Sequence, residues 1–141
     1  MRLRQAGFRL VVVTNQPDLA RGTQRREIID AMHARLAAAL PIDEFRVCDH
    51  DEGDGCVCRK PKPGLLEAAA RDAGLRLADS FMIGDRWRDV TAGRLAGCTT
   101  IFVDWGYAER RPDDPDVTVE SLPAAVEWIL SIPGVSTHET C

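Results

Sequence analysis

The stretch that decides the fold is FRLVVVTNQ, at residues 8–16. Its apolar and β-branched run at residues 8–13 is typical of a strand buried on both faces of a parallel sheet. The polar side chains of Thr14, Asn15 and Gln16 follow at once. In open sheets flanked by helices, ligands bind at the carboxyl ends of the strands. The stretch therefore predicts a buried strand with a candidate site at its end.

Strand and helix patterns alternate along the rest of the chain. Further strands are expected at residues 44–47, 80–83 and 99–103, and helices at residues 25–40, 63–73, 88–95 and 121–130. Residues 2–6 have the pattern of the last turn of a helix that Gly7 ends. This order predicts an α/β fold, a Rossmann-like parallel sheet with helices on both faces. We expect a single domain over residues 1–132, followed by a tail at residues 133–141.

Composition narrows the class of protein. The 141 residues are 45% hydrophobic and carry a net charge of −4, which argues against a general nucleic-acid binder. No segment approaches the length of a membrane span, and the apolar run at residues 10–13 is too short for a signal peptide. We therefore expect a cytoplasmic protein, monomeric at this size, with no nucleic-acid or membrane partner. In that compartment five cysteines favour metal ligands or free thiols over disulfides.

Four of the potential metal ligands lie close together in a short segment. They are Cys48, His50, Cys56 and Cys58. Three thiolates and one imidazole suit tetrahedral zinc and leave no open position, so the zinc would be structural. The alternative is a set of reduced cysteines beside an exposed histidine.

The loop after this cluster carries two cations, and the strand expected at residues 80–83 ends near two carboxylates. The cations are Arg59 and Lys60, and the carboxylates are Asp85 and Asp89. A phosphoryl group requires hydrogen-bond donors, cations for its charge, and carboxylates that hold Mg²⁺. Taken alone, the polar residues at 14–16 could be a strand end, and the carboxylates a helix cap. Their order and placement together favour a phosphoryl site.

Three segments carry a resemblance to a known family. They are VVVTNQPDLARG at residues 11–22, CDHDEGDGCVCRKPKPG at 48–64 and FMIGDRWRD at 81–89. They resemble the second, third and fourth motifs of the haloacid dehalogenase (HAD) superfamily. The cysteine loop resembles that of its zinc-containing branch, which includes heptose-bisphosphate and histidinol-phosphate phosphatases. The resemblance implies a HAD-like fold and a Mg²⁺-dependent phosphatase that hydrolyses a sugar phosphate, most like D-glycero-D-manno-heptose 1,7-bisphosphate.

The resemblance also implies a role for each matching residue. Thr14 and Lys60 would bind the transferring phosphoryl group, and Asp85 would bind Mg²⁺. Asp89 would support the acidic site or the neighbouring Lys60. Substrate contacts would come from Asn15, Gln16, Pro17, Arg59 and Arg86. The zinc bound by Cys48, His50, Cys56 and Cys58 would fix the loop so that Arg59 and Lys60 face the phosphate.

One family motif has no counterpart in this sequence. The family's first motif, Asp-x-Asp-Gly-Thr, supplies the aspartate nucleophile and the general acid/base on a central strand between those ending at Val13 and Ile83. Three interpretations follow. The first is a phosphatase whose nucleophile lies outside this sequence, so that the chain alone is inactive. The second is a pseudoenzyme that binds sugar phosphates, and the third is a small zinc-stabilised interaction module.

Overall fold

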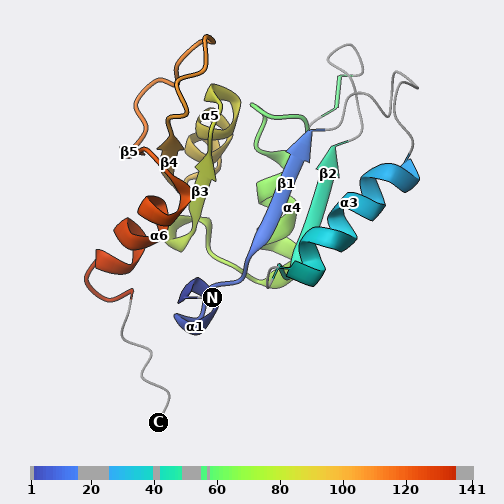
Figure 1. Cartoon of the computed structure of the whole chain (residues 1–141), viewed down its shortest axis with the longest axis horizontal. Helices are drawn as coiled ribbons and strands as arrows, with labels where there is room; N and C mark the ends of the chain where they lie inside the picture. Colours follow the sequence, from blue (N-terminus) through green and yellow to red (C-terminus); the bar gives the residue numbers. More distant parts are fainter. Residues whose placement is uncertain (1, 16–25, 40–41, 49–54, 57, 136–141) are drawn as a thin grey trace.

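The computed structural model describes residues 2–15, 26–39, 42–48, 55–56 and 58–135, so Gln16, Pro17 and His50 lie outside the described residues. The elements in chain order are α1 (Arg2–Gln5), β1 (Val11–Asn15), α3 (Arg26–Ala39), β2 (Glu44–Cys48), α4 (Gly64–Ala73), the 3-10 turn η2 (Leu77–Asp79), β3 (Phe81–Gly84), α5 (Trp87–Ala96), β4 (Thr99–Val103), β5 (Val117–Val119) and α6 (Leu122–Ser131) (Figure 1). The predicted α/β order of strands and helices is confirmed.

The strands form two parallel sheets. One has the order β1-β2 and the other β3-β4-β5. Figure 1 shows β1 and β3 pointing the same way, with β2 beyond β1 and β4 beyond β3. Within the described part of the chain, β1 and β3 share no backbone ladder. The expected parallel sheet is therefore divided between β1 and β3, where the family resemblance places a further strand.

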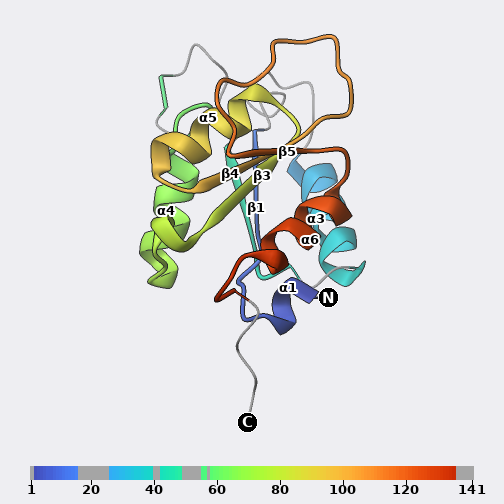
Figure 2. The same cartoon turned by 90° about the vertical axis from the view of Figure 1, so that its left-hand side faces the viewer.

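Helices cover both faces of the strands and join the two sheets. Figure 2 shows α4 and α5 on one side and α1, α3 and α6 on the other. On the α4/α5 side, a buried cluster brings Cys48 of β2 and Met82 of β3 together with Leu65 and Leu66 of α4. On the other side, Leu3 of α1 packs with Ile101 of β4 and with side chains of α6. These two apolar clusters bury surface that would otherwise meet water, and this stabilises the arrangement.

Several predicted boundaries have clear local causes. Gly97 adopts φ +91°, a left-handed conformation that ends α5 at little cost, and its N–H bonds the carbonyl of Arg94 at 3.0 Å. The Oγ of Ser121 accepts a hydrogen bond from Ala124 N at 3.1 Å and so caps α6, as the sequence predicts. No helix among the described residues combines the length and apolar character needed to cross a membrane.

The structure differs from the sequence predictions in the burial of β1 and in the presence of β5. All five residues of β1 are only half-buried, although their β-branched pattern predicts burial on both faces. The physical reason is that β1 pairs with β2 alone, and no described strand lies on its other edge. The short strand β5 was not predicted, because three residues are too few for a periodicity signal.

Helix α3, which the sequence predicts at residues 25–40, carries apolar side chains at helical spacing, and three of them face solvent. Ile28, Met32 and Leu36 are between 44% and 54% exposed. The helix contacts β2 by stacking His33 on Phe45, with the ring centroids 4.6 Å apart. Amphipathic spacing therefore identifies the helix correctly, but it does not identify what covers its apolar face.

Candidate functional site

Lys60 lies at the carboxyl ends of the strands and links the two sheets. Its Nζ donates to the backbone oxygen of Val13 in β1 at 3.0 Å and to Asp89 Oδ1 of α5 at 2.6 Å. The side chains of Lys60 and Asp89 are only 11% and 10% exposed. A buried ammonium requires a partner of opposite charge, and Asp89 supplies it. The ion pair therefore fixes the position of a cation at the edge where both sheets end.

Asn15 holds the backbone of the same lysine. Its Nδ2 donates to the carbonyl of Lys60 at 3.2 Å, and its Oδ1 accepts from Lys60 N at 3.0 Å. These two bonds join positions that are 45 residues apart in the chain. Asn15 was expected to line the substrate loop, but the observed contacts tie the end of β1 to the loop that carries Lys60.

The side chain of Asp89 fits against the end of β3 because the residue there, Gly84, has no side chain. Its Oδ2 accepts from Arg86 N at 3.2 Å, which caps the start of α5. A Cβ at Gly84 would lie 2.2 Å from the Cβ of Asp89, far below contact distance. The Gly-Asp-x-x-x-Asp pattern thus brings the carboxylate of α5 against the end of β3, where it reaches Lys60.

The remaining predicted residues surround this point. Thr14 lies near the end of β1 and is half-buried, as is the side chain of Arg59. Asp85 follows β3 directly and is also half-buried. Arg86 forms an ion pair with Glu109 and lies over the ring of Tyr107, with 4.4 Å from its Cζ to the ring centroid. The acidic partner raises the pKa of the Arg86 guanidinium, which stays charged.

The three described cysteines of the predicted zinc loop come together. Cys48 Sγ lies 3.6 Å from Cys56 Sγ and 2.9 Å from Cys58 Sγ. Within the described ranges, these cysteines are the one cluster in which three or more His, Cys, Asp or Glu side chains lie close enough together to share a metal ion. Thiolates bound to tetrahedral zinc lie about 3.8 Å apart, since each Zn–S bond is about 2.3 Å. The cluster could therefore supply three of four zinc ligands, provided that the sulfurs of Cys48 and Cys58 move slightly apart.

The thiols of this cluster differ in acidity. Burial raises the pKa of Cys56, but the backbone N–H of Arg59 and the neighbouring thiols outweigh it and lower the pKa to about 7. Burial raises the pKa of Cys58 to about 12, and the nearby Cys48 and Cys56 add to that effect. Zinc binds thiolates, and Cys56 is the thiol of this cluster that ionises most readily near neutral pH.

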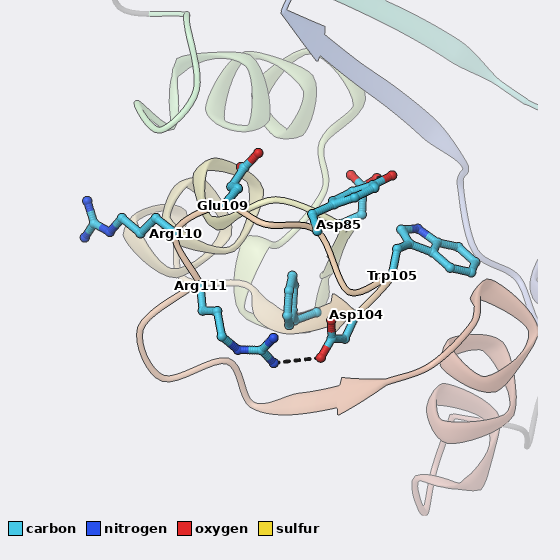
Figure 3. A pocket seen from close by; sticks show the side chains of 8 residues that line it. Asp85, Asp104, Trp105, Glu109, Arg110 and Arg111 are labelled. Carbon is cyan, nitrogen blue, oxygen red and sulfur yellow. Dashed lines mark hydrogen bonds and ion pairs between the residues drawn. The ribbon is translucent and has the colours of Figure 1, made fainter.

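A small, shallow pocket lies beside Asp85 and is lined mainly by the loop that joins β4 to β5. Figure 3 shows Asp85 and Trp105 at one side of it, Arg110 pointing away, and Arg111 paired with Asp104 at 2.7 Å. The Oη of Tyr107 donates to Asp85 Oδ2 at 3.1 Å, and this bond raises the pKa of the tyrosine. The motifs gave no role to this loop. Its position after a parallel strand is the signal that could have identified it.

Comparison with known proteins gives consistent relatives. The family described as HAD-hydrolase-like matches residues 57–125. The D-glycero-beta-D-manno-heptose-1,7-bisphosphate 7-phosphatase of Bordetella bronchiseptica is 38% identical in an alignment of 140 residues, covering 92% of this chain and 78% of the relative. The protein of the same name from Pseudomonas aeruginosa is 37% identical over 119 residues, covering 81% of this chain and 67% of the relative.

Solved structures agree with these relatives. The D,D-heptose 1,7-bisphosphate phosphatase of B. bronchiseptica, solved with magnesium and phosphate, has a TM-score of 0.82 at 34% identity, covering 92% of this chain and 78% of that one. A protein from Mesorhizobium loti, assigned as a HAD-like phosphatase, has a TM-score of 0.79 at 25% identity, covering 99% of this chain and 72% of that one. The motifs, the fold and these relatives lead to one assignment: the chain belongs to the haloacid dehalogenase-like family of hydrolases, among relatives that are phosphatases.

Proposed function

We propose that this protein is a Mg²⁺-dependent phosphatase that acts on a sugar phosphate, with D-glycero-D-manno-heptose 1,7-bisphosphate as the best-supported substrate. The observation that carries the proposal is the placement of Lys60, held by Asn15 and Asp89 where both parallel sheets end. Phosphoryl transfer depends mainly on positioning and charge stabilisation, and a fixed ammonium supplies both. The names of the heptose-bisphosphate phosphatases it resembles support the choice of substrate.

Each residue of the site would have a separate role in binding the substrate or stabilising charge. The ammonium of Lys60 would stabilise negative charge on the phosphoryl oxygens, and the hydroxyl of Thr14 would donate a hydrogen bond to one of them. Arg59 would bind the rest of the substrate. Asp89 would hold Lys60 in place through their ion pair at 2.6 Å. Arg86, which contacts Glu109 and Tyr107, would take part in substrate binding only if the substrate displaces those partners.

Two metal ions belong to the proposal. Asp85 would offer a carboxylate oxygen to Mg²⁺, which commonly uses one or two carboxylates together with water and substrate phosphate. Such a cation, when bound, neutralises charge on the phosphate. The solved relative from B. bronchiseptica contains magnesium and phosphate, which supports this cofactor. Zinc would be held by Cys48, Cys56 and Cys58 with His50, and its role would be to hold the loop before Lys60.

The nucleophile would lie on a strand outside this sequence, placed between β1 and β3. Supporting this, no described strand lies on the facing edge of either, and the apolar residues of β1 are only half-buried. An aspartate on that strand would attack phosphorus, and the bond from phosphorus to the sugar oxygen would break. A second carboxyl group would give its proton to that oxygen. Water would then give a proton to that second carboxylate and attack the aspartyl-phosphate, so that the phosphorus–aspartate bond breaks, inorganic phosphate leaves and both carboxyl groups are restored.

The test is restoration of activity. The chain as given should show no turnover of a sugar bisphosphate with Mg²⁺. A fusion that adds an N-terminal Asp-x-Asp-Gly-Thr segment from a close relative should hydrolyse heptose 1,7-bisphosphate faster than histidinol phosphate. Robust turnover by the unmodified chain would contradict the placement of the nucleophile. A fusion that folds and binds Mg²⁺ but hydrolyses neither substrate would favour the pseudoenzyme.

Single substitutions in the active fusion would separate the roles. Lys60→Ala should lower kcat by about 10²–10³-fold, because its charge is needed most in the transition state. Arg59→Ala should act mainly on KM, since it would contact bound substrate in both states. Lys62→Ala is the matched control, because it removes an exposed lysine two residues away whose ammonium bonds a backbone carbonyl and no carboxylate of the proposed site. If Lys60→Ala and Lys62→Ala had equal kcat values, Lys60 would not be a phosphoryl ligand.

A further inference from the structure

The carboxylate of Asp85 has a partner from a distant part of the chain. The phenol of Tyr107, 22 residues later, donates a hydrogen bond to Asp85 Oδ2 at 3.1 Å. Tyr107 is the only tyrosine in the 141 residues. It lies on the loop between β4 and β5, which contains none of the three family motifs. A carboxylate oxygen that accepts a fixed hydrogen bond loses rotational freedom, so the second oxygen has a defined direction.

The tyrosine is itself held in place by the residue that follows Asp85. The guanidinium of Arg86 lies over the Tyr107 ring at 4.4 Å, and Arg86 forms an ion pair with Glu109. We name Asp85, Arg86, Tyr107 and Glu109 the Tyr107 clamp. Three contacts thus join two consecutive residues at the end of β3 to two nearby residues of the loop. The phenol contacts the carboxylate directly, Arg86 packs on the ring, and Glu109 holds Arg86.

The loop that carries the clamp is anchored at several points. Asp104 Oδ1 accepts from Gly106 N at 2.9 Å, and Asp104 Oδ2 is paired with Arg111 at 2.7 Å. At the far end of the loop, Asp116 Oδ2 accepts from the backbone N of Thr100 at 2.7 Å. Tyr107 is therefore presented to Asp85 from a segment that is fastened on both sides, although 45% of the tyrosine is exposed.

We propose that Tyr107 is a positioning residue for Asp85: its phenol holds Oδ2 and directs Oδ1 toward the divalent cation of the reaction. This inference rests on the proposed role of Asp85 as a Mg²⁺ ligand. Carboxylates that bind metals are usually oriented by hydrogen bonds from neighbouring groups. Removing such a partner typically weakens metal affinity by about 10–100-fold. The clamp gives this protein such a partner from a loop that has no other assigned task.

The first test measures binding of Mg²⁺ to the full chain by backbone amide NMR, followed at Asp85 and Arg86 during a MgCl₂ titration. Tyr107→Phe keeps the ring for Arg86 and removes only the hydroxyl, so affinity should fall about 10-fold or more. Trp105→Phe is the control, since it alters an exposed aromatic side chain of the same loop and should leave affinity unchanged. Asp85→Asn should abolish the response.

A second readout follows the hydrogen bond itself. With tyrosine labelled at Cζ, the chain gives one ¹³C resonance, which should move on addition of Mg²⁺ and also on Asp85→Asn substitution. A chain whose amide and tyrosine signals ignore Mg²⁺ would overturn both the cation role of Asp85 and this inference. If Mg²⁺ binds through Asp85 with equal affinity in wild type and Tyr107→Phe, the inference alone is overturned.

Discussion

Replacing Asn15 with alanine tests whether the end of β1 holds the loop that carries Lys60. The change removes both hydrogen bonds to the Lys60 backbone, at 3.2 and 3.0 Å. A hydrogen bond within a protein contributes about 0.5–1.5 kcal/mol net, so the two together should contribute about 1–3 kcal/mol to the free energy of unfolding. Asparagine and alanine both have low strand propensity, so propensity does not account for a loss of this size.

The assay is urea unfolding of the zinc-loaded chain, followed by tryptophan fluorescence. With an m-value of about 2 kcal/mol/M, the midpoint for Asn15→Ala should fall by about 0.5–1.5 M. Thr118→Ala in β5 is the control, because Thr118 is an exposed strand residue and should change the midpoint little.

Hydrogen exchange at the Lys60 amide separates the local effect from the global one. In the native chain this amide donates to Asn15 Oδ1, so it should exchange slowly and become fast in Asn15→Ala. The reasoning would be refuted by a variant whose urea midpoint matches the control and whose Lys60 amide keeps its protection. That result would mean that the thiol cluster and the Asp89 ion pair are enough to hold the loop.

Three further predictions concern the metal, the close approach at Gly84 and pH. Elemental analysis of the chain purified without chelator should find about one zinc per chain. Cys56→Ser should lose this zinc and Cys98→Ser should keep it, and a native chain without zinc would contradict the proposed metal site. Gly84→Ala should lower the free energy of unfolding by about 1–3 kcal/mol or more, because the new Cβ would lie 2.2 Å from that of Asp89. Urea unfolding measures this loss, and an unchanged midpoint would show that α5 shifts to make room. Burial raises the pKa of Cys98, so the folded thiol stays protonated while the unfolded one ionises above its ordinary pKa of about 8.5. Stability should therefore fall as pH rises from 7 to about 10, and by less in Cys98→Ala; equal losses in both proteins would exclude this thiol as a cause.

Much of the fold could be predicted because local pattern determines local structure. The start of α5 near Gly84-Asp85, its end at Gly97 and the cap at Ser121 all follow from the chemistry of single residues. Burial could not be predicted in the same way. The run at Val11–Val13 has the composition of a central strand, yet its burial depends on which strands lie beside it. Strand neighbours are set by long-range packing, which a sequence window does not contain.

The site shows the same division. Lys60 and Asp89 are identified by motifs, and the structure adds that they form one buried ion pair. The sequence gives no sign that Asn15 bonds the Lys60 backbone, because that contact joins positions 45 residues apart. Tyr107 was missed for a similar reason. A tyrosine between a glycine and an alanine has no distinctive pattern, and its contact with Asp85 arises only when β3 and β4 lie side by side.

The structure of the loop that carries Lys60 explains why a thiol cluster lies next to a cation. Residues 58–63 form no helix or strand, and a single turn, with a hydrogen bond from Lys62 N to the Arg59 oxygen at 2.9 Å, supports the backbone there. Such a segment has little local structure to fix a side chain, so its restraints must come from outside. The thiol cluster holds the loop before Lys60, Asn15 holds the Lys60 backbone, and Asp89 holds its ammonium. Catalysis by placement loses rate when a charged group moves by about an ångström. Losing any one of these restraints should therefore affect the position of the Lys60 ammonium before it affects the fold.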